Sequence, residues 1–142
     1  MKVSDILRSK GSEVCSVGPA ASVRDALELM AAKGIGALVV LEGGEVVGIL
    51  SERDYAREVE LKGRTAAATP VGAIMTGKVA CIEPGNTVEE CMALMTHKRI
   101  RHLPVVEDGR LVGLVSIGDV VKAIISHQQF LIEQLEHYIT TG

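Results

Sequence analysis

Two serine–aspartate pairs have the side-chain types and the spacing that suit a sugar phosphate. Ser51 and Asp54 recur as Ser116 and Asp119, and each pair follows an aliphatic run at the predicted start of a helix. The free amides of a helix N-terminus and the positive end of its dipole favour a phosphate. A carboxylate in the first turn accepts hydrogen bonds from a vicinal diol, as ribose offers, and a serine hydroxyl donates to a phosphate oxygen. These four side chains are therefore candidates for binding nucleotides.

The same spacing also has a purely structural interpretation. Ser-x-x-Asp is a helix capping box, in which the hydroxyl and the carboxylate satisfy backbone amides of the first turn. Ser22 with Asp25 and Thr87 with Glu90 have this pattern at two other predicted helix starts and carry no functional implication. For the first two pairs, capping alone and ligand binding both stay open at this point.

Two cationic side chains distinguish the second half of the chain from the first. Arg101 and His102 begin a predicted aliphatic strand, whereas Gly36 and Ala37 occupy the equivalent positions 65 residues earlier. Two neighbouring cations favour an anion, and a nucleotide phosphate would neutralise them. We therefore expect two unequal clefts, one equipped for phosphate and one more apolar. Arg53 either reaches a phosphate or simply lies in solvent.

These residues lie in a tandem duplication. Residues 14–59 and 79–124 align without a gap at an offset of 65. Each copy has the succession of aliphatic runs, glycine turns and capped helices that predicts the order β-α-β-β-α. We expect an α/β (α+β) fold in which the two repeats pack with pseudo-twofold symmetry, leaving a seam where paired clefts form. The expected divisions are a first motif at 1–63, a linker at 64–70, a second motif at 71–126 and a C-terminal helix extension and tail at 127–142.

The last predicted helix is longer than its counterpart in the first half. It begins at Ser116 and reaches about Thr140, whereas the helix that begins at Ser51 ends near Lys62. Its apolar residues keep the three- and four-residue spacing of one helical face: Val121, Ile124, Ile125, Leu131, Ile132, Leu135 and Ile139. Because the distal half has no counterpart, this stripe either folds back on the domain or packs on another chain. We favour a homodimer contact.

Composition argues against several classes of function. A net charge of −3 with three aromatic residues does not suit a nucleic-acid binder. No apolar run approaches the roughly eighteen residues of a membrane span, and the first residues do not resemble a signal peptide. Cys15, Cys81 and Cys91 form neither a disulfide framework nor a ligand-spaced pair, so buried or half-buried thiols in a reducing compartment are expected. The histidines lack clustered ligands for a metal. We expect a soluble cytoplasmic protein without a metal.

The repeated Gly-x-x-Ser-x-x-Asp turns, together with Arg101-His102-Leu103-Pro104-Val105, resemble a tandem pair of CBS (cystathionine-β-synthase) motifs, a Bateman module. The resemblance covers about residues 3–125, and residues 51–57 are similar to free-standing bacterial members without an attached enzyme. It implies adenosine-containing ligands, AMP, ADP, ATP, NAD(H) or S-adenosylmethionine, in two clefts between the motifs. Asp54 and Asp119 would bind the ribose, with Ser51 and Ser116 as their partners.

The resemblance also implies where the adenine base lies. The slot would be lined by the ends of the first strands and the starts of the second strands, at Ser16, Val17, Cys81, Ile82, Ile35 and Ile100. Members of the family commonly draw the aspartate of a cleft from one motif and the base-slot residues from the other. Such an exchange would bring Asp54 together with Arg101 and His102. It would also leave Asp119 beside Gly36 and Ala37, which suit phosphate poorly.

The sequence thus favours a non-catalytic adenine-nucleotide sensor that changes its geometry for an unidentified protein partner. A structural dimerisation adaptor with vestigial clefts and an S-adenosylmethionine sensor are the alternatives. An enzyme acting on a nucleotide is disfavoured, because no nucleophile–base pair or carboxylate pair converges near the Ser-x-x-Asp turns.

Overall fold

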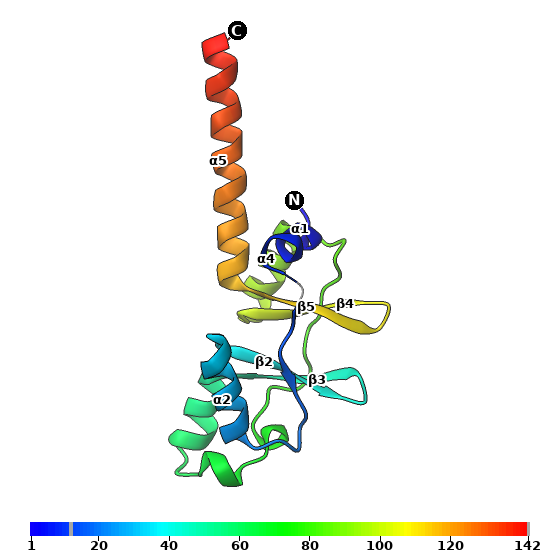
Figure 1. Cartoon of the computed structure of the whole chain (residues 1–142), viewed down its shortest axis with the longest axis vertical. Coiled ribbons are helices and arrows are strands. Elements are labelled where there is room, and N and C mark those ends of the chain that lie inside the picture. Colours follow the sequence, from blue (N-terminus) through cyan, green and yellow to red (C-terminus); the bar gives the residue numbers. More distant parts are fainter. Residues whose placement is uncertain (12, 142) are drawn as a thin grey trace.

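The computed structural model describes residues 1–11 and 13–141 and consists of two similar halves with a protruding terminal helix (Figure 1). One half holds a three-stranded sheet of order β1-β2-β3, and the other holds the two-stranded sheet β4-β5. The elements are α1 (Val3–Lys10), β1 (Ser16–Val17), α2 (Val23–Lys33), β2 (Ala37–Glu42), β3 (Glu45–Ser51), α3 (Glu52–Tyr55), η1 (Ala56–Glu60), η2 (Ala66–Ala68), η3 (Val71–Ala73), α4 (Val88–Lys98), β4 (His102–Glu107), β5 (Arg110–Ser116) and α5 (Ile117–Thr141).

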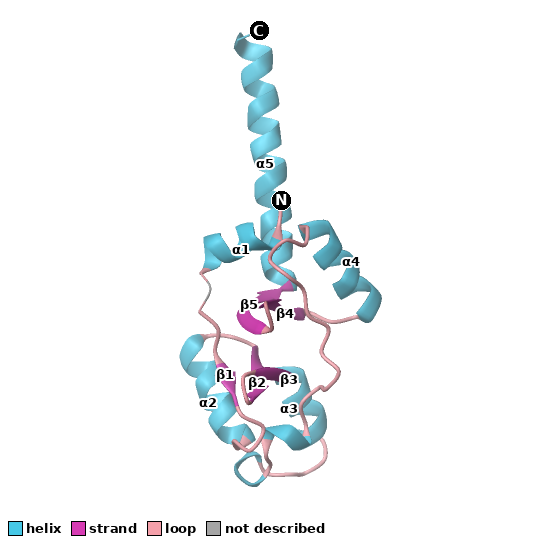
Figure 2. Cartoon of the chain, turned by 90° about the vertical axis from the view of Figure 1, so that its right-hand side faces the viewer, coloured by secondary structure: helices cyan, strands magenta, loops and turns pink. Residues whose placement is uncertain are grey.

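The two halves repeat each other in detail. The antiparallel pair β2–β3 shifts its register between Val40 and Leu41, and β4–β5 shifts at the equivalent step, between Val105 and Val106. Both hairpin turns use left-handed backbone, at residues 43–44 and 108–109. Figure 2 shows α2 and its equivalent α4 on opposite sides of the stacked sheets, as a twofold arrangement requires. The predicted fold class is confirmed.

The first strand of the second half is shorter than the sequence predicts. Ser16 and Val17 pair in parallel with β2, whereas the corresponding segment makes a single bridge between Ile82 and Val105. Pro104 stands where the first half has Val39. Proline has no N–H to donate, so the ladder does not extend by a second bridge.

The helix after Ser51 also differs from its prediction as one α-helix running to about Lys62. Only Glu52–Tyr55 is α-helical, and Ala56–Glu60 forms a π-helical turn. The Leu61 amide donates to the Ala56 carbonyl at 3.0 Å, which is the wider i→i+5 bond. This turn carries Val59, which is buried in the core of the first half.

Each hydrophobic core is completed by a segment that lies next to the other motif in sequence. Val3, Ile6 and Leu7 of α1 pack in the core of the second half, with Leu103 of β4. The segment that follows the predicted linker packs in the core of the first half, through Val71, Ile74 and Met75. The linker itself contains a short 3-10 helix and the buried Thr69. The halves are therefore interlocked rather than strung in succession.

The glycine three residues before each serine makes room for these segments. A Cβ atom on Gly48 would lie 2.5 Å from Met75 Sδ, and one on Gly113 would lie 2.5 Å from Leu7 Cδ2. Real Cβ atoms do not approach so closely. A side chain at residue 48 would also lie 2.9 Å from the Thr76 carbonyl oxygen and push that backbone away, and one at residue 113 would displace the Leu7 side chain. The Gly-x-x-Ser spacing thus couples the helix start to the packing of the neighbouring segment.

The terminal helix α5 leaves the body after its first turns. Val120 is buried in the second core and Ala123 and Ile124 pack against it, but every side chain from Ile125 to Thr140 is exposed. Figure 1 shows the distal half of α5 standing clear of both halves. The alternative that this half folds back on the domain is therefore wrong. Across residues 1–11 and 13–141, no helix combines the length and apolar character needed to cross a membrane.

Candidate functional site

Both Ser-x-x-Asp pairs form complete capping boxes. The Ser51 amide donates to Asp54 Oδ2 at 2.9 Å, and the Asp54 amide donates to Ser51 Oγ at 3.2 Å. Ser116 and Asp119 repeat this geometry at 2.9 and 3.1 Å. The structural interpretation as helix caps is thus confirmed, but capping does not use all the hydrogen-bond acceptor sites of the two carboxylates. Each carboxylate has about four lone-pair sites, and the serine amide takes one. At Asp54 the Ser51 hydroxyl also donates to Oδ2, at 3.1 Å.

The two carboxylates differ in what else they bind. The Thr76 hydroxyl donates to Asp54 Oδ1 at 3.2 Å, a neutral and weak contact. The Lys10 ammonium group, from α1, donates to Asp119 Oδ2 at 2.6 Å and to the Leu114 carbonyl at 2.8 Å. The Asp119 side chain is 22% exposed and that of Lys10 is 38% exposed, so this ion pair is partly shielded from solvent. A diol at Asp119 must share or replace the lysine.

Electrostatics at Asp119 favour its charged form. Burial by itself raises the pKa of this carboxyl, but hydrogen bonds from Lys10 and from the Ser116 amide act in the opposite direction and prevail. The pKa of Asp119 therefore lies below its ordinary value. An ionised carboxylate is the form that accepts two hydrogen bonds from a diol.

Arg101 and His102 lie beside the Ser-x-x-Asp turn of their own half. His102 pairs with Ser116 across β4–β5, and the Ile117 amide donates to the Arg101 carbonyl at 2.8 Å. In the first half, Ala37 pairs with Ser51 and the Gly36 carbonyl accepts from Glu52 in the same way. These backbone contacts place Arg101 and His102 beside the Ser116 turn of their own motif. The exchange that would bring them to Asp54 stays a prediction.

His102 is half-buried in this cluster and carries a perturbed pKa. Burial is the main cause that lowers its pKa, and the positive charges of Lys10 and Arg101 lower it further, while Asp119 acts in the opposite direction. The imidazole is therefore neutral near pH 7 when no further anion is present. Arg101 is exposed, so its guanidinium is available to solutes.

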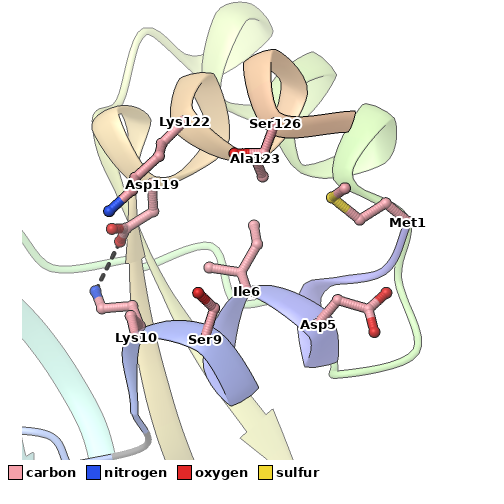
Figure 3. Close-up of a pocket in the computed structure, with 9 residues that line it drawn as sticks. All are labelled: Met1, Asp5, Ile6, Ser9, Lys10, Asp119, Lys122, Ala123 and Ser126. Atoms are coloured by element: carbon pink, nitrogen blue, oxygen red, sulfur yellow. Dashed lines mark hydrogen bonds and ion pairs between the residues drawn. The ribbon is translucent and has the colours of Figure 1, made fainter. Parts of the chain in front are cut away.

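A cavity of about 200 Å³ adjoins Asp119 between α1 and α5 (Figure 3). Lys10 and Lys122 lie on either side of the Asp119 carboxylate, and Ile6 and Ala123 provide an apolar wall. Of the fifteen predicted site residues, Asp119 alone lines this cavity. The end of the cavity at Asp119 carries the two lysines, and a second carboxylate, that of Asp5, lines the other end.

The predicted base-slot residues alternate between core and surface. Ile82 is buried, and Val17, Ile35 and Ile100 are half-buried against the two cores. Ser16 and Cys81, their neighbours along the chain, are exposed. This alternation follows from the two-residue period of extended backbone. Ala37, at the position equivalent to His102, is buried as well. The outward-facing Ser16 and Cys81, and the exposed edges of the half-buried residues, remain accessible to a ligand, whereas Ile82 and Ala37 serve the core. Arg53 is exposed at the start of α3.

The cysteines only partly follow the sequence prediction. Cys91 is buried and Cys15 half-buried, as expected, but Cys81 is exposed. Burial and the nearby charge of Asp119 raise the pKa of Cys91 to about 11, so its thiol is unreactive near neutral pH. Among residues 1–11 and 13–141, no three His, Cys, Asp or Glu side chains gather closely enough to hold a metal ion.

Two residues that contact the aspartates, Lys10 and Thr76, were missed by the sequence analysis. They lie outside the gap-free duplication, in the segments that the halves exchange. A signal was available, because Val3, Ile6 and Leu7 recur as Val71, Ile74 and Met75 at an offset of 68. An alignment of the two halves with a three-residue gap extends the repeat to both segments and predicts that they occupy equivalent places beside the two turns.

Comparisons with known proteins identify the family. The chain matches the CBS domain over residues 3–61 and 71–126. It is 39% identical to the mitochondrial CBS domain-containing protein CBSX3 of Arabidopsis thaliana, over 99% of this chain and 72% of the relative. A CBS-domain protein of Burkholderia ambifaria, assigned to signal transduction, is 50% identical with a TM-score of 0.85, over 90% of this chain and 96% of the other.

A more distant structure shares the fold. The CBS domain pair of MJ0100, in complex with 5′-methylthioadenosine and S-adenosyl-L-methionine, is 23% identical with a TM-score of 0.79, over 89% of this chain and 98% of the other. None of these three proteins is named as an enzyme. The chain belongs to the CBS-domain family and carries two CBS domains in tandem.

Proposed function

We propose that this protein is a non-catalytic regulatory module that binds an adenine nucleotide beside Asp119. One observation carries the proposal: a serine, an ionised carboxylate, the cations Lys10 and Arg101 and the ionisable His102 gather at the start of α5. Asp119 suits a ribose diol, and the cations suit the phosphate of AMP, ADP, ATP or NAD(H). A second, less cationic site at Asp54 would take a ligand without relying on phosphate.

The proposed signal is a change in how the two halves, or two copies of the chain, are arranged. A ligand shifts such an equilibrium only through unequal affinity for the two arrangements. Lys10 makes the two affinities unequal. A ribose at Asp119 competes with this lysine, and the lysine joins α1 to the second half. An unidentified protein partner reads the shift. The three free cysteines, Cys15, Cys81 and Cys91, suit a reducing compartment such as the cytoplasm.

S-adenosylmethionine is a second candidate ligand, since the MJ0100 pair holds it together with 5′-methylthioadenosine. Thermal unfolding of the full chain with AMP, ATP, NADH and S-adenosylmethionine compares the two classes. A ligand at about 100 times its Kd adds about 2.7 kcal/mol to the free energy of unfolding, which raises the Tm by about 5 to 10 °C. Cytidine monophosphate is the control. No shift with any adenosine compound would favour a structural adaptor, and chromatography of the nucleotide after incubation with magnesium separates binding from turnover.

We expect the His102 imidazole to take up a proton when the nucleotide binds. A phosphate near the imidazole raises its pKa from the lowered value of the free protein, so affinity for AMP increases as the pH falls from about 7 toward 6. Below the pKa of the free protein the imidazole is already protonated, and the uptake disappears. Calorimetry in buffers of different ionisation enthalpy measures it. His102→Gln should abolish the uptake, and replacing the exposed His97 with Gln should preserve it.

A further inference from the structure

We propose that the exposed face of α5 pairs with the same face of a second copy of this chain, as a parallel two-stranded coiled coil. α5 has 25 residues and is therefore about 38 Å long, at about 1.5 Å per residue. From Ile125 onward none of its described side chains is buried or half-buried. Helices of about 12 to 15 residues without tertiary contacts are marginal in water, so a helix this exposed calls for a partner.

Five of the exposed apolar residues of α5 fall on a heptad, whereas Leu131 and Tyr138 flank it and Phe130 lies farther round the helix. Two series at seven-residue spacing make one seam: Ile125, Ile132 and Ile139, and Val121, Gln128 and Leu135. The first series takes the a positions and the second the d positions of a left-handed coiled coil. Within the seam Ile125, Leu135 and Ile139 are 59%, 62% and 77% exposed. The seam begins at Val121, which is itself 47% exposed, so the body of the protein does not cover its near end.

A second copy in parallel fits this seam better than the reversed orientation. Isoleucine at a with leucine at d favours two parallel strands. In parallel register Gln128 meets Gln128, and the two amides can hydrogen-bond to each other. Antiparallel pairing over the same span sets Gln128 against Ile132, which leaves a buried amide without a polar partner. No charged residue occupies the seam, so two identical helices bring no like charges together there.

The mass of the full chain without nucleotide tests this inference independently of the proposed function. Light scattering after size exclusion should give about 30 kDa, twice the 15.0 kDa of one chain. Ile132→Asp should yield the 15 kDa species at micromolar concentration. Gln134→Asp, on the opposite face, should stay dimeric. Circular dichroism checks that each variant is folded, which is expected because both positions lie outside the cores.

Cross-linking tests the orientation. In a Cys15→Ser, Cys81→Ser background, Ile139→Cys should oxidise to a disulfide dimer, because parallel strands bring identical seam positions together. Gln134→Cys should not. A monomeric native chain, a dimer that survives Ile132→Asp, equal loss with Gln134→Asp, or a dimer in which Ile139→Cys fails to cross-link would each overturn the proposal.

Discussion

Replacing Asp119 with asparagine is expected to weaken AMP binding by about ten- to a hundredfold. Hydrogen bonds to a charged group contribute about 1.5 to 3 kcal/mol, and each 1.4 kcal/mol is about tenfold in Kd. Asparagine retains an oxygen that can accept from the Ser116 amide, so the start of α5 stays capped. Calorimetry with AMP, ATP and NADH measures the change. Asp54→Asn should produce a comparable loss only for ligand bound in the first half.

The control for this experiment is another first-turn aspartate. Asp25 follows the capping residue Ser22 at the start of α2, away from the candidate site residues. Asp25→Asn should leave the affinity for AMP unchanged. The affinity of Lys10→Met for AMP is a second measurement, because this variant frees the Asp119 carboxylate from its ion pair and removes one cation. Unaltered affinity for all three ligands in Asp119→Asn would refute the ribose role.

Replacing Leu103 with alanine is expected to lower the free energy of unfolding by about 2 to 5 kcal/mol, as large-to-small changes in a close-packed core do. Leu103 is fully buried in the core of the second half, and it directly follows His102 in β4. The side chain of α1 residue Leu7 packs in the same core. The substitution should therefore loosen both the strand that carries His102 and the helix that carries Lys10.

Urea unfolding followed by circular dichroism measures this loss. Leu61→Ala, at a side chain that is 81% exposed, is the matched control and should change stability by no more than about 0.5 kcal/mol. Because each half is completed by a segment from beside the other, we expect one transition for the whole body. A loss below about 1 kcal/mol for Leu103→Ala would contradict the close packing of this core.

The interlocked cores also explain why the candidate sites are unequal. The start of the first motif brings Lys10 to Asp119, and the start of the second motif brings Thr76 to Asp54. One duplication thus produced two equivalent turns whose electrostatics differ through residues outside the repeated block. The charged Arg101 and the ionisable His102, which have no equivalent in the first half, increase the difference.

The sequence by itself determined the features that depend on neighbours within a turn or two. The capped helix starts at Ser51 and Ser116, the glycine hairpin turns and the length of α5 follow from local spacing, and the structure confirms them. The π-helical turn after Tyr55 was not predicted, because over five residues the spacing of apolar side chains does not distinguish a π turn from an α turn.

Only the tertiary structure decided which groups meet at each aspartate. Lys10 and Asp119 are 109 residues apart, and their contact depends on α1 crossing to the second half. The placement of His102 beside Ser116 follows from the register of β4 with β5, and the direction of α5 follows from where that sheet ends. Such contacts arise from the packing of whole elements, which local periodicity does not encode.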